Sequence, residues 1–139
     1  KTYMKLILSE WWSYNIKKYQ IEIDGTCVFD DQAVQISFAN GSQFGNNVVI
    51  SPESKTDDGL IELCIVKPFQ FYEIPFLLLS LATNRFHLSK RVEIISCAEA
   101  TILSKNAMKH LDGEPKDLSD CLQLKVLPKS ISIISKKLV

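Results

Sequence analysis

The stretch "RVEIISCAEATILSKNAMKHLDGEPKDLSDCLQLKVLPKSISII" (Arg91–Ile134) decides the fold. It holds five short strand-like runs separated by polar turns, namely "RVEIISC", "EATILS", "NAMKHL", "CLQLKVLP" and "SISII". Closely spaced short strands without a βαβ rhythm are typical of antiparallel β domains with two packed layers. The sequence therefore predicts a mainly β fold, an antiparallel two-layer β-sandwich.

Strand patterns continue upstream of this stretch. In "KYQIEIDG", Tyr19, Ile21 and Ile23 alternate with polar residues, which predicts a half-buried strand that ends in an Asp-Gly turn. "AVQISFA" alternates in the same way. "GLIELCIV" (Gly59–Val66) is a denser apolar run, so we expect a strand that is buried on both faces.

Two segments carry helical patterns. Apolar residues in "KTYMKLILSEWWSYN" follow helical spacing and predict an N-terminal helix over about residues 2–13. "YEIPFLLLSLAT" predicts an internal helix that starts near 71–74, because Pro75 fits only in a first turn. No Pro/Gly/Ser-rich linker divides the chain, so we expect a single domain over residues 1–139.

Composition excludes several classes of protein. Sixteen basic residues balance sixteen acidic ones, which argues against a nucleic-acid partner. The four cysteines stand alone in or beside apolar runs and predict small buried hydrophobes in a reducing compartment, not disulfides or a zinc site. The longest apolar run, "IPFLLLSLA", has nine residues and is too short to span a bilayer. We expect a soluble, cytoplasmic protein.

Two acidic turns could carry chemistry. In "TDDGL", Asp58 could cap the turn, or its carboxylate and nearby carbonyls could bind a hard cation such as Mg²⁺. In "LDGEPKD" (Leu111–Asp117), Glu114 could be a solvated turn residue or a general base, and Pro115 is expected to end the local strand. Local sequence leaves both choices open.

Taken in order, these motifs resemble a known family. The run "QISFANGSQFGNNVVISPESKTDDGLIELCIV", a helix, "LDGEP" and "LQLKVLPKSISII" together are similar to the C-terminal half of the diacylglycerol kinase catalytic-domain family, which includes bacterial lipid kinases and sphingosine kinases. The resemblance covers about residues 17–135. Members have two domains, and the N-terminal domain carries a G-G-D-G-T nucleotide motif that this sequence lacks.

The resemblance implies a role for each turn. Glu114 matches the glutamate taken as the base that activates a lipid hydroxyl, which then attacks the γ-phosphate of ATP. The D-G-L turn implies a magnesium ion held by the Asp58 carboxylate and by the carbonyls of Lys55 and Leu60. The chain would then be the second, β-sandwich domain of a longer kinase, inactive alone, with ATP bound mainly by the N-terminal domain.

The resemblance also implies partners: a diacylglycerol- or sphingosine-like alcohol, the kinase's own N-terminal domain and peripheral contact with a membrane; homodimerisation stays open.

Two departures from the family pattern concern the identity of the lipid more than the fold. The family's glycine-rich run appears as "GNN" (Gly45–Asn47), and Arg85 stands where a glycine precedes the histidine. Two alternatives remain, a non-catalytic lipid- or protein-binding sandwich and an inactive kinase relative.

Overall fold

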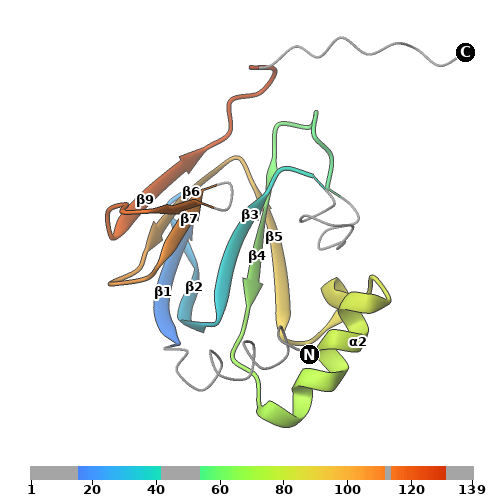
Figure 1. Cartoon of the computed structure of the whole chain (residues 1–139). Coiled ribbons are helices and arrows are strands. Elements are labelled where there is room, and N and C mark those ends of the chain that lie inside the picture. The colour runs from blue at the N-terminus through green and yellow to red at the C-terminus, as the bar shows by residue number, and fades with distance from the viewer. Residues whose placement is uncertain (1–15, 42–53, 112–113, 131–139) are drawn as a thin grey trace, which may run out of the picture.

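The computed structural model describes residues 16–41, 54–111 and 114–130. Within them lie two antiparallel sheets that face each other (Figure 1), and a separate two-stranded sheet. The first sheet has the order β2-β1-β6-β9, and the second has the order β3-β4-β5. The bounds of the first sheet's strands are β1 Lys17–Ile23, β2 Thr26–Ala33, β6 Glu99–Leu103 and β9 Cys121–Lys125. Those of the second are β3 Gln35–Ala39, β4 Ile61–Val66 and β5 Val92–Cys97. The predicted β-sandwich is confirmed.

The core lies between the two sheets. Ile21 of β1 and Leu63 and Ile65 of β4 are completely buried. They cluster with Phe29, Ala33, Cys97, Ala100 and Ile102, which come from both sheets. Burial of each large aliphatic side chain contributes about 1.5–3 kcal/mol, so this layer holds the sheets together.

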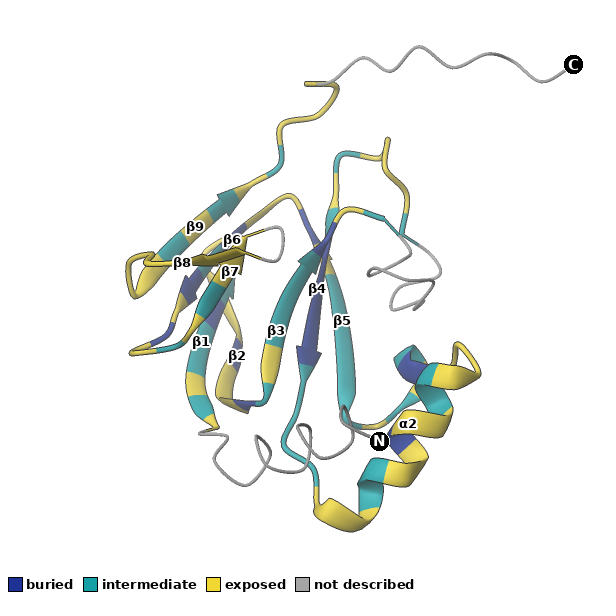
Figure 2. Cartoon of the chain, in the orientation of Figure 1, coloured by how far each residue is buried: buried dark blue, intermediate teal, exposed yellow. Residues whose placement is uncertain are grey.

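Strand β4 is the most buried strand of the described chain (Figure 2), as the dense run "GLIELCIV" predicted. Its Leu63 and Ile65 belong to the core, while Glu62 and Cys64 are buried on the other face. A buried carboxylate needs a partner. Ser96, the cross-strand neighbour of Glu62 on β5, donates its hydroxyl to Glu62 Oε2 at 2.9 Å.

The hairpin β1–β2 turns on the Asp24–Gly25 dipeptide. Both residues have positive φ, 51° and 73°, as a two-residue turn with the twist of the sheet requires. Strand β2 has no counterpart among the predicted strands. Only Phe29 and Ala33 of β2 are buried, because β2 is an edge strand with most of its side chains in water. Its sequence therefore lacks the two-residue alternation.

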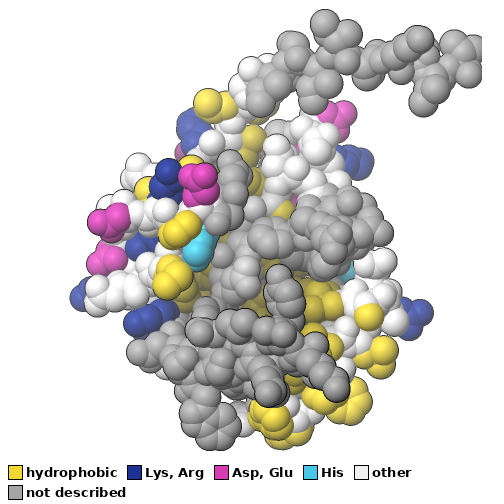
Figure 3. Space-filling view, viewed as in Figure 1, with side chains coloured by type: hydrophobic (Ala, Val, Ile, Leu, Met, Phe, Trp, Pro, Cys, Tyr) yellow, Lys and Arg dark blue, Asp and Glu magenta, His cyan; other side chains and the backbone are white. Residues whose placement is uncertain are grey.

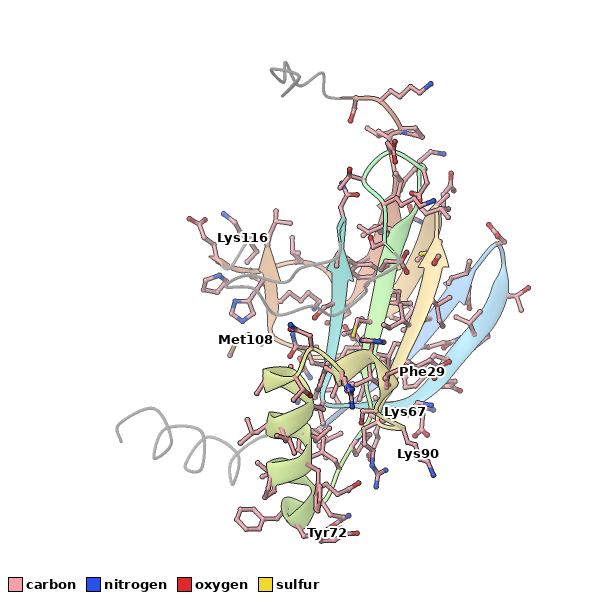
Figure 4. The ribbon with its side chains drawn as sticks, turned by 90° about the vertical axis from the view of Figure 1, so that its right-hand side faces the viewer. Phe29, Lys67, Tyr72, Lys90, Met108 and Lys116 are labelled. Carbon is pink, nitrogen blue, oxygen red and sulfur yellow. The ribbon has the colours of Figure 1, made fainter. Side chains whose placement is uncertain are left out.

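The internal helix is confirmed. The 3-10 turn η1 (Phe71–Glu73) runs into α2 (Ile74–Ala82), with Pro75 in the first turn. A second 3-10 turn, η2 (Phe86–Leu88), leads on toward β5. Helix α2 stands beside the second sheet on the side away from the first sheet (Figures 1 and 4). None of the described helices is long and apolar enough to cross a bilayer.

The hairpin of β7 (Lys109–Leu111) and β8 (Glu114–Lys116) corrects one expectation. Pro115 does not end the strand; it sits in the middle of β8 and pairs with His110. Proline has no N–H to donate and is tolerated on an exposed edge strand of this kind. Of the predicted strand "NAMKHL" only residues 109–111 are extended in a ladder.

Two cysteine assignments are also corrected. Cys64 and Cys97 are buried as expected, but Cys27 and Cys121 are exposed. They lie on β2 and β9, which are the two edges of the first sheet. The predicted N-terminal helix, most of the loop 39–47 and most of the run "SISII" lie outside the described residues.

Candidate functional site: two acidic turns

The D-G-L turn lies at the start of β4, where the chain enters the second sheet. The carboxylate of Asp58 accepts a hydrogen bond from the backbone N–H of Leu60, with Oδ1 and N 2.9 Å apart. Gly59 between them has a φ of 77°, a left-handed conformation that side chains disfavour. Asp58 therefore caps its own turn through one oxygen, and within the described residues its second oxygen has no hydrogen-bond partner.

This geometry suits a hard cation in part. Asp58 is exposed to solvent, and the carbonyl of Leu60 follows in the same turn. The described residues contain no group of three acidic, histidine or cysteine side chains that could hold a metal. A metal here would have one carboxylate, backbone carbonyls and water as ligands, a mixture that Mg²⁺ accepts. Lys55 is also exposed, and within the described residues no hydrogen bond joins it to the turn.

The turn has a neighbour from the far end of the chain. A Cβ added to Gly59 would lie 3.4 Å from Cγ of Pro128, which follows β9. Just before it, the N–H of Val126 donates to the carbonyl of Ala98 at 2.8 Å. The segments "DGL" and "VLP", which both belong to the resemblance, therefore lie next to each other in the structure. The sequence did not reveal this contact, because about seventy residues separate the two segments.

Glu114 begins β8 and pairs with Leu111 across the hairpin. Its side chain is 76% exposed and forms an ion pair with Lys116, with Oε2 and Nζ 3.5 Å apart. Residues i and i+2 of a strand share one face, so the alternation of β8 brings the two side chains together. This partner was missed because the segment was read as a turn and not as a strand.

A hollow of about 390 Å³ lies along the hairpin and includes Pro115 and Lys116 in its lining. Lys109 and Lys116 are direct cross-strand neighbours there. Like charges at such positions repel, and each lysine has its own carboxylate. Lys109 Nζ lies 3.6 Å from Asp120 Oδ1 and donates to the carbonyl of Ala107 at 3.3 Å.

The two turns remain separate in the described part of the chain. Among the described residues no hydrogen bond or ion pair joins Glu114 to Asp58, and they belong to different elements, hairpin β7–β8 and the start of β4. His87, which carried no assigned role, has its Nδ1 buried without a hydrogen-bond partner in the described structure. The candidate site thus consists of the exposed carboxylate of Glu114 and the turn capped by Asp58, and both belong to the same β-sandwich domain.

A family model for the YegS C-terminal NAD kinase beta sandwich-like domain matches residues 1–135. The chain belongs to this YegS C-terminal domain family. The match confirms the resemblance at the level of family and fold.

Solved structures share the fold of this YegS C-terminal-type domain. One structure of a proposed diacylglycerol kinase from Bacillus anthracis strain Sterne aligns over 88% of this chain with a TM-score of 0.66 and 20% identity. A second aligns over 82% with a TM-score of 0.64 and 22% identity. A further diacylglycerol kinase structure from the same strain aligns over 86% with a TM-score of 0.58 and 19% identity.

The chain spans 40%, 38% and 42% of the length of those three chains, respectively. The similarity therefore concerns one part of each of those proteins. No curated protein matches this YegS C-terminal-type chain.

Proposed function

We propose that this chain is the lipid-substrate domain of an ATP-dependent lipid kinase and that Glu114 is its general base. The observation that carries the proposal is the family match over residues 1–135, together with structural neighbours described as diacylglycerol kinases. The substrate class is a lipid alcohol of the diacylglycerol or sphingosine type.

The exposure of Glu114 supports its role as a base. A general base must come within hydrogen-bond reach of the proton that it removes, and Glu114 stands on a strand open to solvent. The hydroxyl proton would pass to a carboxylate oxygen of Glu114 as the hydroxyl oxygen attacks the γ-phosphorus of ATP. The bond from the γ-phosphorus to the bridging oxygen would break, and ADP would leave with that oxygen. Lys116, 3.5 Å from Oε2, would orient the carboxylate until the substrate arrives.

ATP would come from the other domain. Phosphoryl transfer depends mainly on positioning and charge stabilisation, and this sequence has no glycine-rich phosphate loop. When bound, a magnesium ion would add positive charge at the D-G-L turn, held by Asp58 and by the carbonyls of Lys55 and Leu60. Asp58 already orders that turn through Leu60.

The test uses the gene product in which this chain is joined to its N-terminal nucleotide domain. Glu114→Gln keeps the size of the side chain and removes the base, so we expect lipid phosphorylation to fall about 10²–10⁴-fold. Glu99→Gln is the matched control, because Glu99 is also an exposed strand carboxylate paired with a lysine, Lys125. Near-normal activity in the Glu114 variant would overturn the base assignment. If the gene product has no nucleotide-binding domain, the proposed kinase function is overturned.

A further inference from the structure

Helix α2 is apolar except for Ser80. Its segment "IPFLLLSLA" contains no charged residue. Such helices are normally buried all round. Here only Leu77 is buried, while Phe76 is 73% exposed and Leu79 is 62% exposed. One face packs on the domain, and the other lies in water.

The exposed apolar surface extends beyond the helix onto the two 3-10 turns that flank it. We name it the α2 patch, and it consists of Phe71, Tyr72, Phe76, Leu78, Leu79 and Leu88. Figure 3 shows hydrophobic side chains gathered over this lower right part of the molecule. In Figure 4, Tyr72 lies at the foot of the molecule, at the start of α2. A contiguous patch of this kind marks an interaction surface.

The net charge around the patch is positive. Residues 67–93 hold two acidic side chains and four basic ones, Lys67, Arg85, Lys90 and Arg91. Both acids are neutralised. Glu73 pairs with Arg91 at 2.9 Å, and Glu93 pairs with Lys67 at 2.7 Å. Arg85 and Lys90 have no carboxylate partner in the described structure.

The two unpaired cations adjoin the apolar surface directly. A hollow of about 370 Å³ between α2 and η2 is lined by Phe76 and Leu88 together with Arg85 and Lys90. An apolar surface edged by free cations is complementary to a bilayer that carries anionic lipids. Aromatic side chains add to this match, because they favour the boundary between headgroups and acyl chains.

We propose that the α2 patch docks on the surface of an anionic membrane. Phe76 and Leu79 enter the interfacial region, and Arg85 and Lys90 contact lipid phosphates. The inference is independent of the catalytic assignment, because vesicle binding is measured without ATP.

The test is co-sedimentation of the full chain with phosphatidylcholine vesicles, with and without phosphatidylglycerol. We expect binding that depends on the anionic lipid and weakens with salt. Phe76→Ser combined with Leu79→Ser removes the apolar contact, and Arg85→Glu combined with Lys90→Glu reverses the charge. We expect each pair of changes to weaken binding about tenfold or more.

Matched controls lie elsewhere on the surface. Met108→Ser changes an apolar side chain that is 82% exposed on the segment before β7. Lys105→Glu combined with Lys129→Glu changes two exposed charges away from α2. We expect both controls to bind vesicles more tightly than the corresponding α2 variants, and circular dichroism checks that every variant is folded.

Several results would overturn the proposal. One is an unmodified chain that does not bind anionic vesicles, and another is binding that both α2 variants retain. A chain that avoids vesicles but forms dimers that Phe76→Ser disrupts would assign the patch to a second copy. If the same α2 variants leave the vesicle binding of a longer gene product unchanged, the rest of that product covers the patch.

Discussion

The carboxylate of Asp58 accepts a hydrogen bond from the backbone N–H of Leu60 across a distance of 2.9 Å, so one side chain closes the turn and, in the proposed magnesium site, would also be a ligand. These two roles can be separated. Asp58→Asn keeps an oxygen that can accept the hydrogen bond and removes only the charge. Asp58→Ala removes the hydrogen bond as well.

We predict that Asp58→Ala destabilises the chain by about 1 kcal/mol even in EDTA, because the turn loses its cap. Asp58→Asn should match the unmodified chain in EDTA and lose the stabilisation that Mg²⁺ gives. A bound ion stabilises only the folded state, so thermal unfolding in the two buffers measures it. Asp57→Asn is the control. An equal magnesium shift in Asp58→Asn would contradict a metal at this turn.

Glu114→Gln should leave the stability of the chain unchanged to within about 0.5 kcal/mol, since exposed ion pairs contribute little. Urea denaturation measures this difference. As a reference, Ile65→Ala removes a fully buried side chain and should cost about 2–5 kcal/mol. A large loss in Glu114→Gln would mean that the hairpin depends on the Glu114–Lys116 pair, and kinase data on that variant would then report folding.

Acid should weaken the attachment of α2. Arg91 donates to both carboxylate oxygens of Glu73 at 2.9 Å, and the N–H of Gln70 adds a third hydrogen bond at 2.7 Å. The Arg91 guanidinium, followed by the Gln70 N–H, lowers the pKa of Glu73. A lowered pKa means that the contribution to stability is complete above the ordinary range of glutamate, near pH 4.3, and is lost as the pH falls through the lower folded value.

We therefore predict that Glu73→Gln is less stable than the unmodified chain at neutral pH and that the difference shrinks below about pH 4. Thermal unfolding over a pH series measures it, and Glu99→Gln corrects for carboxylates in general. If the stability difference between the two proteins stays constant down to acidic pH, the Glu73–Arg91 ion pair does not cause it.

Thiol chemistry should divide the cysteines into two classes. Burial raises the pKa of Cys64 to about 11 and also raises that of Cys97. Since the thiolate is the reactive form, both should react slowly with an alkylating reagent near pH 8, while the exposed Cys27 and Cys121 react quickly. Mass spectrometry after short exposure counts the modified thiols. Rapid labelling of Cys64 in the folded chain would contradict a buried β4.

The strands that face the core could be predicted from the sequence, because burial on one face leaves a two-residue alternation. That holds for β1, with Ile21 at its centre, and β4 shows the denser pattern of a strand covered on both faces. The edge strands β2 and β8 could not be predicted in this way. Most of their side chains are exposed to water, so burial does not impose an alternation of apolar and polar residues on their sequence.

The candidate site also has a part that could be predicted from the sequence and a part that could not. Glu114 and Asp58 could be named from the order of the motifs, since each is encoded by a few adjacent residues. Their contacts could not. The Glu114–Lys116 pair requires β8 to be a strand through Pro115, and the contact of Gly59 with Pro128 requires the whole sandwich.

The contact between Gly59 and Pro128 has an evolutionary consequence. A Cβ at position 59 would already be in van der Waals contact with Pro128, at 3.4 Å, so a side chain that extends further would need space that the proline ring occupies. Positions 59 and 128 should therefore covary among relatives: where the turn carries a side chain in place of glycine, a smaller residue should replace the proline. The D-G-L and V-x-P motifs would then be inherited as a pair, although each looks like an independent signature in the linear sequence.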